Sequence, residues 1–400
     1  MPPGPLRALR HRDYRLFWSS QFLSLTGTWM QSLAQAWLVL ELTRSPFQLG
    51  LVSALQFGPF LVFSFLAGVV VDRMPKRKLI IWTQAARGLQ AALLAALVFT
   101  GEVRYWHVAV LALAAGIANT LDMPARQAFV IDLVGREDLL NAIALNSANF
   151  NAARTVGPAL GGLLIGAWGP GAAFALNALA FLAPIGALLA VRTEGYGGPR
   201  TRRPIVEEIG EGIAYAARTP RLAFVLAILL VVSLFIFNYN VMVPLYARQV
   251  LLADARGLGF LMSALGIGAM VGAVVQAIAS DERPRLRVIV MAGLTLGFAS
   301  VAMSFLREFP SAAVVLFVMG LVGIVFMNSC NTTVQLGVRD ELRGRVMGLY
   351  SFVFVGSTPI GSFLMGMIAE HAGVAESYFV GGAATLIGLA ALWAWRGRTR

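Results

Sequence analysis

The sequence contains little charge and almost no cysteine. Charged residues make up 13% of its 400 residues and hydrophobic residues 58%, whereas soluble domains carry about 25% charged residues. The polar side chains are too few to cover so much apolar surface in water, which excludes a string of soluble domains and a disordered chain. The single cysteine, Cys330, excludes an internal disulfide framework. The composition therefore predicts an all-α polytopic membrane protein.

Signatures of enzymatic, metal and nucleic-acid chemistry are also missing. No Gly-x-x-x-x-Gly-Lys loop is present to bind ATP phosphates, so primary transport is not indicated. The three histidines, His11, His107 and His371, are far apart in the predicted topology, which argues against a metal site. The basic loops are short and lack interleaved aromatic residues. We therefore expect neither an enzyme nor a cofactor, a metal or a nucleic-acid partner.

Long apolar runs are abundant. A helix needs about 20 mostly apolar residues to cross a bilayer, and the first such run has no cleavage site of small residues, so we expect it to be retained as an anchor. The sequence predicts twelve membrane-spanning helices at 16–40, 49–71, 79–99, 107–124, 141–166, 172–191, 222–245, 257–279, 287–306, 311–333, 346–369 and 374–395.

Lysine and arginine are distributed unevenly about these spans. With the N-terminus inside, 25 of the 32 basic residues fall in inner segments, 5 in outer segments, and 2, Arg87 and Arg154, within spans. Inner segments of membrane proteins carry an excess of lysine and arginine. The distribution predicts that both termini are cytoplasmic. The net charge of +12 therefore reflects orientation in the membrane and does not indicate a nucleic-acid partner.

The polar stretch 192–221 divides the chain into two halves, residues 1–191 and 222–400. Within this linker, isoleucines at 205, 209 and 213 are spaced four residues apart, with glutamates between them. This spacing predicts a short amphipathic helix along the membrane surface. A linker with one amphipathic turn is the alternative.

Two charge motifs recur in corresponding places of the halves. Residues 72–78 follow the second span as 281–287 follow the eighth, and residues 136–139 precede the fifth span as 339–342 precede the eleventh. Such a repeat indicates two pseudo-symmetric halves of six helices in parallel orientation. This is the architecture of a secondary transporter with a substrate site between its halves.

The loop after the second span carries a recognisable motif. It reads Gly68-Val-Val-Val-Asp72-Arg73-Met-Pro-Lys76-Arg77. It resembles the signature of the major facilitator superfamily, although Pro75 replaces the usual glycine. The resemblance implies the major facilitator fold, and an inner gate that latches the outward-facing state. Gly68 would let two helices approach closely, and Asp72 would pair with basic groups or cap a helix. The alternative for the basic residues is a simple positive-inside anchor.

A second motif lies in the fifth span. It reads Ala153-Arg154-Thr-Val-Gly157-Pro158-Ala-Leu-Gly161-Gly162. It is similar to the antiporter motif of superfamily exporters, with Ala153 in place of the first glycine. The resemblance implies that this face seals the two halves together and that the protein exports its substrate. Ordinary packing of small residues is the alternative, and Pro158 permits a kink.

Further stretches resemble the branch that contains the enterobactin exporter and drug-efflux proteins. They are 27–31, 127–133, 141–146 and 342–347. The resemblance implies a monomer in a bacterial inner membrane that exports small amphipathic molecules, such as drugs, siderophores or metabolites, by proton antiport with alternating access. Two alternatives remain: an importer or facilitator of a small metabolite, and a non-transporting membrane sensor or scaffold.

Few ionisable groups lie within the predicted spans. A centred arginine costs about 2.5–3.5 kcal/mol on insertion scales, so Arg154 is expected either to bind an anionic substrate in a cavity or to pair with an acid. Arg87 is expected to reach the inner surface by snorkelling. Asp122 and Glu41 are the candidate proton carriers. Asp122 would alternatively pair with Arg126, one turn further along.

Polar and aromatic residues cluster in the first, fourth, seventh and tenth spans. In the resembled fold these four helices line the central cavity, and a mixed amide and aromatic lining suits amphipathic compounds. The alternative is hydrogen bonding between helices. Together with Arg154 of the fifth span, the candidate substrate residues are Trp29, Gln31, Gln35, Asn119, Asn238, Asn240, Asn328 and Asn331.

Overall fold

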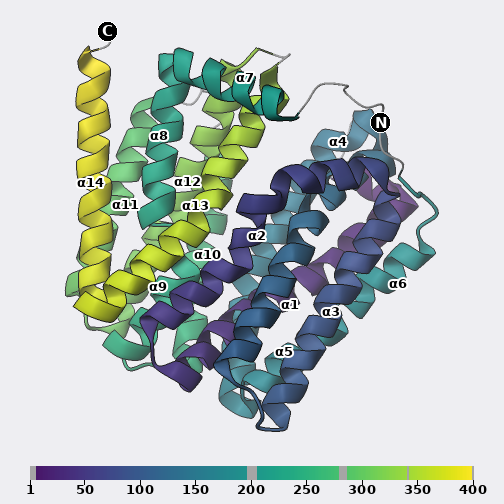
Figure 1. Ribbon diagram of the computed structural model, residues 1–400, viewed down its shortest axis with the longest axis horizontal. Helices are drawn as coiled ribbons and strands as arrows, with labels where there is room; N and C mark the ends of the chain where they lie inside the picture. Colours follow the sequence, from purple (N-terminus) through teal and green to yellow (C-terminus); the bar gives the residue numbers. More distant parts are fainter. Residues whose placement is uncertain (1–5, 196–204, 279–285, 340–341, 399–400) are drawn as a thin grey trace. The chain divides into compact units, whose positions relative to one another are not determined.

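The computed structural model describes residues 6–195, 205–278, 286–339 and 342–398 (Figure 1). The described part of the chain consists of helices and the segments that connect them. Each of the twelve predicted spans coincides with helix in the described residues, although the sixth is divided between two helices and the seventh is interrupted, and the ends differ from the predictions by a few residues. Long apolar runs form helices in a membrane because every backbone group must be satisfied within its own segment.

The first six predicted spans correspond to helices α1 to α6. Their bounds are α1 (Arg12–Thr43), α2 (Pro46–Arg73), α3 (Lys76–Phe99), α4 (Tyr105–Trp168), α5 (Pro170–Ala180) and α6 (Leu182–Ala190), preceded by η1 (Arg7–Arg10). The fourth and fifth spans both belong to α4, whose axis breaks at Gly135, where φ is 71°. Glycine adopts this left-handed conformation without steric cost.

The remaining spans follow the amphipathic helix α7. The bounds are α7 (Ile205–Arg218), α8 (Pro220–Phe235), α9 (Tyr239–Leu245), the π-helical η2 (Tyr246–Val250), α10 (Ala255–Ile278), α11 (Leu286–Phe305), α12 (Phe309–Gly337), α13 (Arg343–Ala372) and α14 (Val374–Arg398). The seventh span is interrupted after α8, and the backbone is non-helical at Asn238.

Nine helices in the described residues are long and apolar enough to cross a membrane. One of them is α4, which holds two predicted spans, whereas α1 and α3 are not in this set. These two helices carry many polar side chains, and several of them are buried. They include Gln21, Ser24, Gln31 and Gln35 in α1, and Thr83, Gln84, Arg87 and Gln90 in α3. The polar residues that lower the hydropathy of α1 and α3 are concentrated in the candidate site described below.

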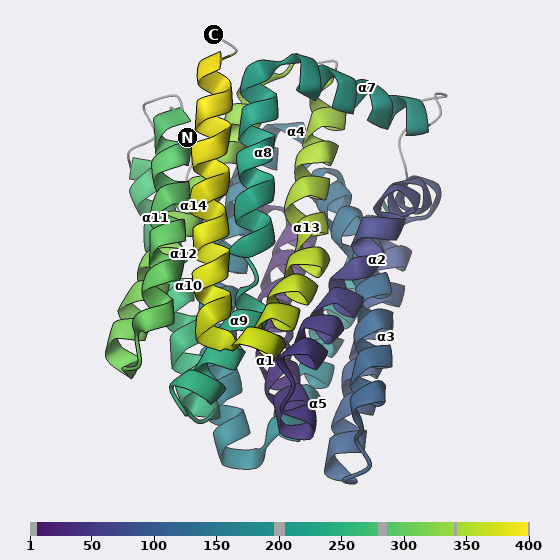
Figure 2. The same ribbon diagram turned by 60° about the vertical axis from the view of Figure 1, so that its left-hand side comes forward.

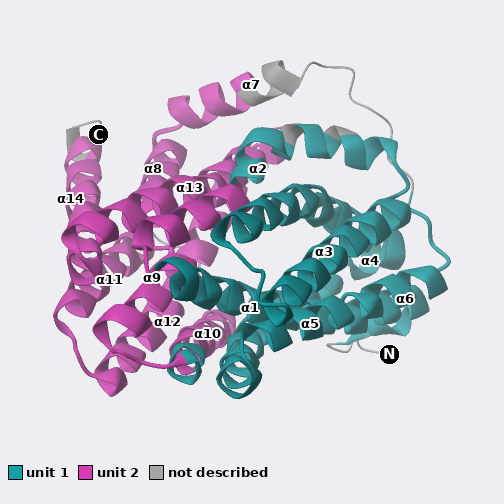
Figure 3. Ribbon diagram, turned by 60° about the horizontal axis from the view of Figure 1, so that its bottom comes forward, with its two compact units in different colours: residues 1–43, 58–201, 255–259 teal, residues 44–57, 202–254, 260–400 magenta. Residues whose placement is uncertain are grey.

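The helices group into two compact units (Figure 3). Unit 1 contains residues 1–43, 58–201 and 255–259, and unit 2 contains 44–57, 202–254 and 260–400. In unit 1, α1 and α3 pack along α4 and α5; in unit 2, α11 packs along α14 and α12, and α8 packs on α13 and α14.

Parts of the repeated charge motifs fall outside the described residues. These parts are 281–285 of the motif after the eighth span, and 340–341 of the motif before the eleventh. Residues 196–204 of the predicted linker also fall outside. The first copy of each motif lies in unit 1 and can be followed in full.

Candidate functional site

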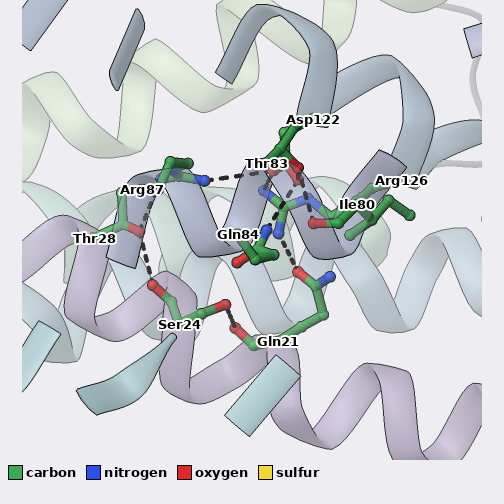
Figure 4. A network of polar contacts seen from close by, with 9 residues as sticks. All are labelled: Gln21, Ser24, Thr28, Ile80, Thr83, Gln84, Arg87, Asp122 and Arg126. Carbon is green, nitrogen blue, oxygen red and sulfur yellow. Dashed lines mark hydrogen bonds and ion pairs between the residues drawn. The ribbon is translucent and has the colours of Figure 1, made fainter. Parts of the chain in front are cut away.

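A carboxylate is completely buried within α4. Asp122 is 0% exposed and accepts hydrogen bonds on Oδ1 from the Thr83 hydroxyl at 2.7 Å and the Gln84 side-chain amide at 2.9 Å. Its Oδ2 forms ion pairs with Arg126 at 2.6 Å and Arg87 at 3.4 Å (Figure 4). Two cations therefore share one carboxylate in the interior of unit 1.

Helical spacing places these groups. Asp122 and Arg126 are four residues apart on α4, which brings their side chains to one face. Thr83 and Arg87 have the same spacing on α3, and that face of α3 packs against α4. The pair of Asp122 with Arg126 is the alternative that the sequence left open, and it is present. The proton-carrier role of Asp122 stays a prediction.

The cluster continues onto α1 through hydroxyl and amide groups. The Arg87 guanidinium donates to Thr28 Oγ1 at 3.1 Å, and Arg126 donates to Gln21 Oε1. The Thr28 hydroxyl in turn donates to the Ser24 carbonyl oxygen at 2.7 Å. This ring of contacts joins α1, α3 and α4 (Figure 4). A movement of any of these helices would change the partners of the buried charges.

The position of Arg87 corrects a prediction. We expected its side chain to reach the inner membrane surface, but Arg87 is only 8% exposed, pairs with Asp122, and lies over the Phe181 ring with 5.0 Å between Cζ and the ring centroid. A buried charge is tolerated when it is paired and hydrogen-bonded, and Asp122 and Thr28 supply those partners.

A second polar contact joins α1, α3 and α5. Gln31 donates to Gln90 Oε1 at 3.0 Å and accepts from the Asn177 amide at 2.6 Å. Gln31 and Gln35 are 9% and 5% exposed. The Gln31 amide thus makes hydrogen bonds between helices, as the alternative interpretation of the polar cluster expects.

An aromatic and cationic group lies between α1 and the second part of α4. The Arg154 Cζ is 5.9 Å from the centroid of the Trp29 ring, and the Trp29 and Phe150 rings meet edge to face at 5.7 Å. Arg154 is half-buried. A guanidinium over an indole face is favourable.

The other candidate cavity residues occupy different environments. Asn238 is buried, donates to the Leu234 carbonyl oxygen at 2.7 Å and accepts from the Ser362 hydroxyl. Asn328 donates to Gln276 Oε1 at 2.9 Å. The remaining three candidates, each half-buried, are Asn119 in unit 1 and Asn240 and Asn331 in unit 2. Within unit 1, the structure brings Trp29 and Arg154 together.

The other candidate proton carrier lies at the end of α1. Glu41 is exposed and accepts a hydrogen bond from Trp37 Nε1 at 2.6 Å. In the described part of the chain, no group of three histidine, cysteine, aspartate or glutamate residues is arranged to hold a metal ion.

The inner-gate motif is tied to α4 and α6 through its basic residues. Lys76 is 6% exposed, and its Nζ lies 2.7 Å from Oδ2 of Asp132 in α4. Arg77 donates to the carbonyl oxygens of Leu188 and Leu189 at 2.7 and 3.1 Å. A cation at these last carbonyls of α6 stabilises the helix C-terminus. The Asp132 partner was not predicted, because nothing in the sequence aligns α3 with α4.

Three other members of the inner-gate motif make fewer contacts. Asp72 and Arg73 are exposed. An added Cβ at Gly68 would meet no described atom within 4 Å, and the role expected of this glycine stays a prediction.

We expect the pair of Lys76 with Asp132 to stabilise unit 1 measurably. Lys76→Gln and Asp132→Asn should each lower the free energy of unfolding by about 1.5–3 kcal/mol, because each breaks a hydrogen bond between charged groups. Their effects should be non-additive in a double-mutant cycle measured by chemical denaturation in detergent. Strictly additive effects would contradict a direct interaction.

Basic side chains of the N-terminal segment surround another buried acid, and we call this group the N-terminal clasp. Asp138, whose side chain is 1% exposed, pairs with Arg7, with Arg10 at 2.9 Å and with His11 at 2.8 Å. The hydrogen bond from His11 lowers the pKa of Asp138 below its ordinary value, and the attraction of the two arginines acts in the same direction against desolvation. The clasp fastens η1 to the α4 segment that follows Gly135.

The lowered pKa of Asp138 gives this clasp a defined pH dependence. An acid whose pKa is lower in the folded state stabilises the protein above its unfolded pKa, and this contribution is lost as pH falls through the folded pKa. The thermal midpoint of the wild type should therefore fall more steeply between about pH 5 and pH 2 than that of Asp138→Asn. Parallel profiles in differential scanning fluorimetry would contradict this.

The antiporter motif forms a tight helix crossing. An added Cβ at Gly157 would lie 2.6 Å from Trp29 Cβ and 2.8 Å from the Thr26 carbonyl oxygen. At Gly162 it would lie 2.7 Å from the Ala255 carbonyl oxygen. Gly161 contacts Met30 in the same way, and Pro158 is buried beside it. Small residues thus bring the α4 backbone against α1 and the start of α10, as such residues do in membranes.

Helices of this length and apolar composition indicate a polytopic membrane protein, and comparison with known proteins identifies its family. The sequence profile of the family described as transmembrane secretion effector matches residues 3–399. The chain belongs to this family, which is part of the major facilitator superfamily.

Known relatives cover nearly the whole chain. The multidrug efflux pump Tap of Mycolicibacterium fortuitum is 29% identical over 369 residues, which are 89% of this chain and 90% of that protein. The staphyloferrin A transporter of Staphylococcus aureus is 23% identical over 93% of both chains. The crystal structure of the nucleoside transporter NupG superposes with a TM-score of 0.74 at 12% identity, over 96% of this chain and 98% of that one. The major facilitator fold predicted from the sequence is confirmed.

Proposed function

We propose that this protein exports small amphipathic molecules from the cytoplasm by proton antiport with alternating access. The observation that carries the proposal is the buried cluster of Asp122, Arg87 and Arg126 in a chain that otherwise holds little charge. Ionisable groups inside a membrane protein are costly and are retained where ions or protons move. The similarity to an efflux pump and a siderophore transporter supports small molecules as cargo.

The proposed coupling step uses the two ion pairs of Asp122. A proton from outside binds a carboxylate oxygen of Asp122 and neutralises it, which removes its attraction for Arg126 and Arg87. The contacts among α1, α3 and α4 weaken, and the protein changes state. The proton leaves toward the cytoplasm when the ion pairs form again. Glu41 is the second candidate carrier, and the Glu41→Gln variant tests it in the same assay.

The substrate group is proposed to include Trp29 and Arg154. The indole offers an apolar face and the guanidinium a positive charge, which together suit an amphipathic molecule with an aromatic or anionic part. In this account the pair of Lys76 with Asp132 holds α3 against α4 beside the inner-gate motif, and the glycines of α4 let unit 1 pack closely. The protein acts in a bacterial inner membrane with both termini in the cytoplasm.

The proposal is tested by dye accumulation in cells that lack their own efflux pumps. Cells that express the protein should accumulate less ethidium than cells with the empty vector, and a protonophore should remove the difference. Higher accumulation on expression would favour import instead. Unchanged accumulation across a panel of amphipathic dyes, in the wild type and in Asp72→Asn alike, would favour a sensor or scaffold and overturn the proposal.

A further inference from the structure

Two apolar grooves flank α11 and share one end. A groove of about 470 Å³ lies between α11 and α14. A second, of about 360 Å³, lies between α11 and α12. Arg287 and Met291 line both grooves. Figures 1 and 2 show α11 and α14 side by side, and all three helices belong to unit 2.

The walls of both grooves are almost entirely hydrocarbon. The first is lined by Leu294, Leu389 and Trp393, and the second by Thr295, Leu321 and Val325. Met291 on the ridge between the grooves is 62% exposed. A membrane-spanning helix that exposes such a side chain presents it to lipid, so the natural occupant of each groove is an acyl chain.

The shared end of the grooves is positively charged. The Arg287 side chain is exposed, and within the described residues no ion pair engages it. The Arg396 guanidinium lies 5.5 Å from the centroid of the Trp393 ring. Tryptophan and arginine together are typical of the level of lipid headgroups.

We propose that α11 binds one anionic diacyl phospholipid. Its two acyl chains occupy the two grooves, one on each side of the helix, and its phosphate lies against Arg287 on the predicted cytoplasmic side. Two grooves that meet at one cation match two chains that are joined at one anionic headgroup. A free phosphate would leave the grooves empty, and a zwitterionic lipid would gain less from the arginine. Basic pockets between helices on this side of the membrane suit anionic headgroups.

Native mass spectrometry of the detergent-purified full-length protein tests the headgroup. The wild type should bind 1-palmitoyl-2-oleoyl-phosphatidylglycerol more tightly than the phosphatidylcholine with the same chains. Arg287→Gln should weaken phosphatidylglycerol binding about fivefold, the effect of one basic residue near an anionic surface. Arg221→Gln removes another exposed arginine of the predicted inner side, at the start of α8, and should bind as the wild type does.

A second pair of variants tests the grooves. Met291→Trp should place a bulkier side chain into one of the grooves and lower phosphatidylglycerol occupancy, whereas Phe298→Trp, at an α11 position that is also 62% exposed, should not. The single-chain lysophosphatidylglycerol should bind more weakly than the diacyl lipid. These side chains are exposed, so all variants should elute from size-exclusion chromatography as the wild type does. Unchanged binding in either Arg287→Gln or Met291→Trp would overturn the proposal.

Discussion

Asp122→Asn is expected to lower the free energy of unfolding by about 3–5 kcal/mol, the cost of removing one partner from a buried salt bridge. The neutral amide leaves Arg126 and Arg87 buried without their anion, with side chains that are only 16% and 10% exposed. Chemical denaturation of the purified protein in detergent measures this. The same variant should also lose proton-coupled export.

A matched control separates this effect from the loss of any carboxylate. Glu102→Gln changes an exposed acid in the loop between α3 and α4 and should alter stability by less than about 0.5 kcal/mol. A second variant tests the cause. Adding Arg87→Gln to Asp122→Asn removes one of the unpaired cations and should restore part of the lost stability. If Asp122→Asn is as stable as Glu102→Gln, the ion pairs do not hold these helices together.

Gly157→Leu should cost about 3 kcal/mol or more, the upper end of the range for overpacking. Even a single Cβ at this position would overlap Trp29 Cβ and the Thr26 backbone oxygen, and neither is the movable tip of a side chain. The helices α1 and α4 must therefore separate. The expected results are a sharply lower thermal midpoint and a loss of transport.

Gly186→Leu is the control for this substitution. An added Cβ at Gly186 in α6 would meet no described atom within 4 Å, so leucine there should be tolerated. Leucine also has a higher helix propensity than glycine, which should stabilise α6 slightly in the control variant. Equal losses of stability in the two variants would contradict the close crossing of α1 and α4 as the cause.

The positions of the helices could be predicted from the sequence, because membrane spans are defined locally. Runs of apolar residues broken by charge gave the limits of α2 and α11 to within a few residues. The pair of Asp122 with Arg126 was also accessible, because a spacing of four residues on one helix is a local signal. The break of α4 at Gly135 is also a local feature, but no residue pattern gives the angle between the two parts of the helix.

Contacts between helices could not be predicted, because they depend on the register of one helix against another. Arg87 pairs with Asp122 across α3 and α4, and Lys76 with Asp132 across the same two helices. The hydropathy pattern does not show which face of α3 meets α4, or how far one helix is shifted along the other. The clasp of Asp138 depends likewise on where the N-terminal segment folds back.

The measurement that tests the central claim most directly is gradient-driven transport by the purified protein in proteoliposomes. With an imposed pH gradient, ethidium should move against the proton flux in vesicles that hold the wild type. Asp122→Glu keeps the carboxylate and should retain part of this transport. Asp122→Asn, checked for folding by size-exclusion chromatography and circular dichroism, should lose the response to the gradient. Equal responses of Asp122→Asn and the wild type would contradict a proton-carrying role for Asp122, and ethidium flux that ignores the gradient in the wild type would contradict proton antiport.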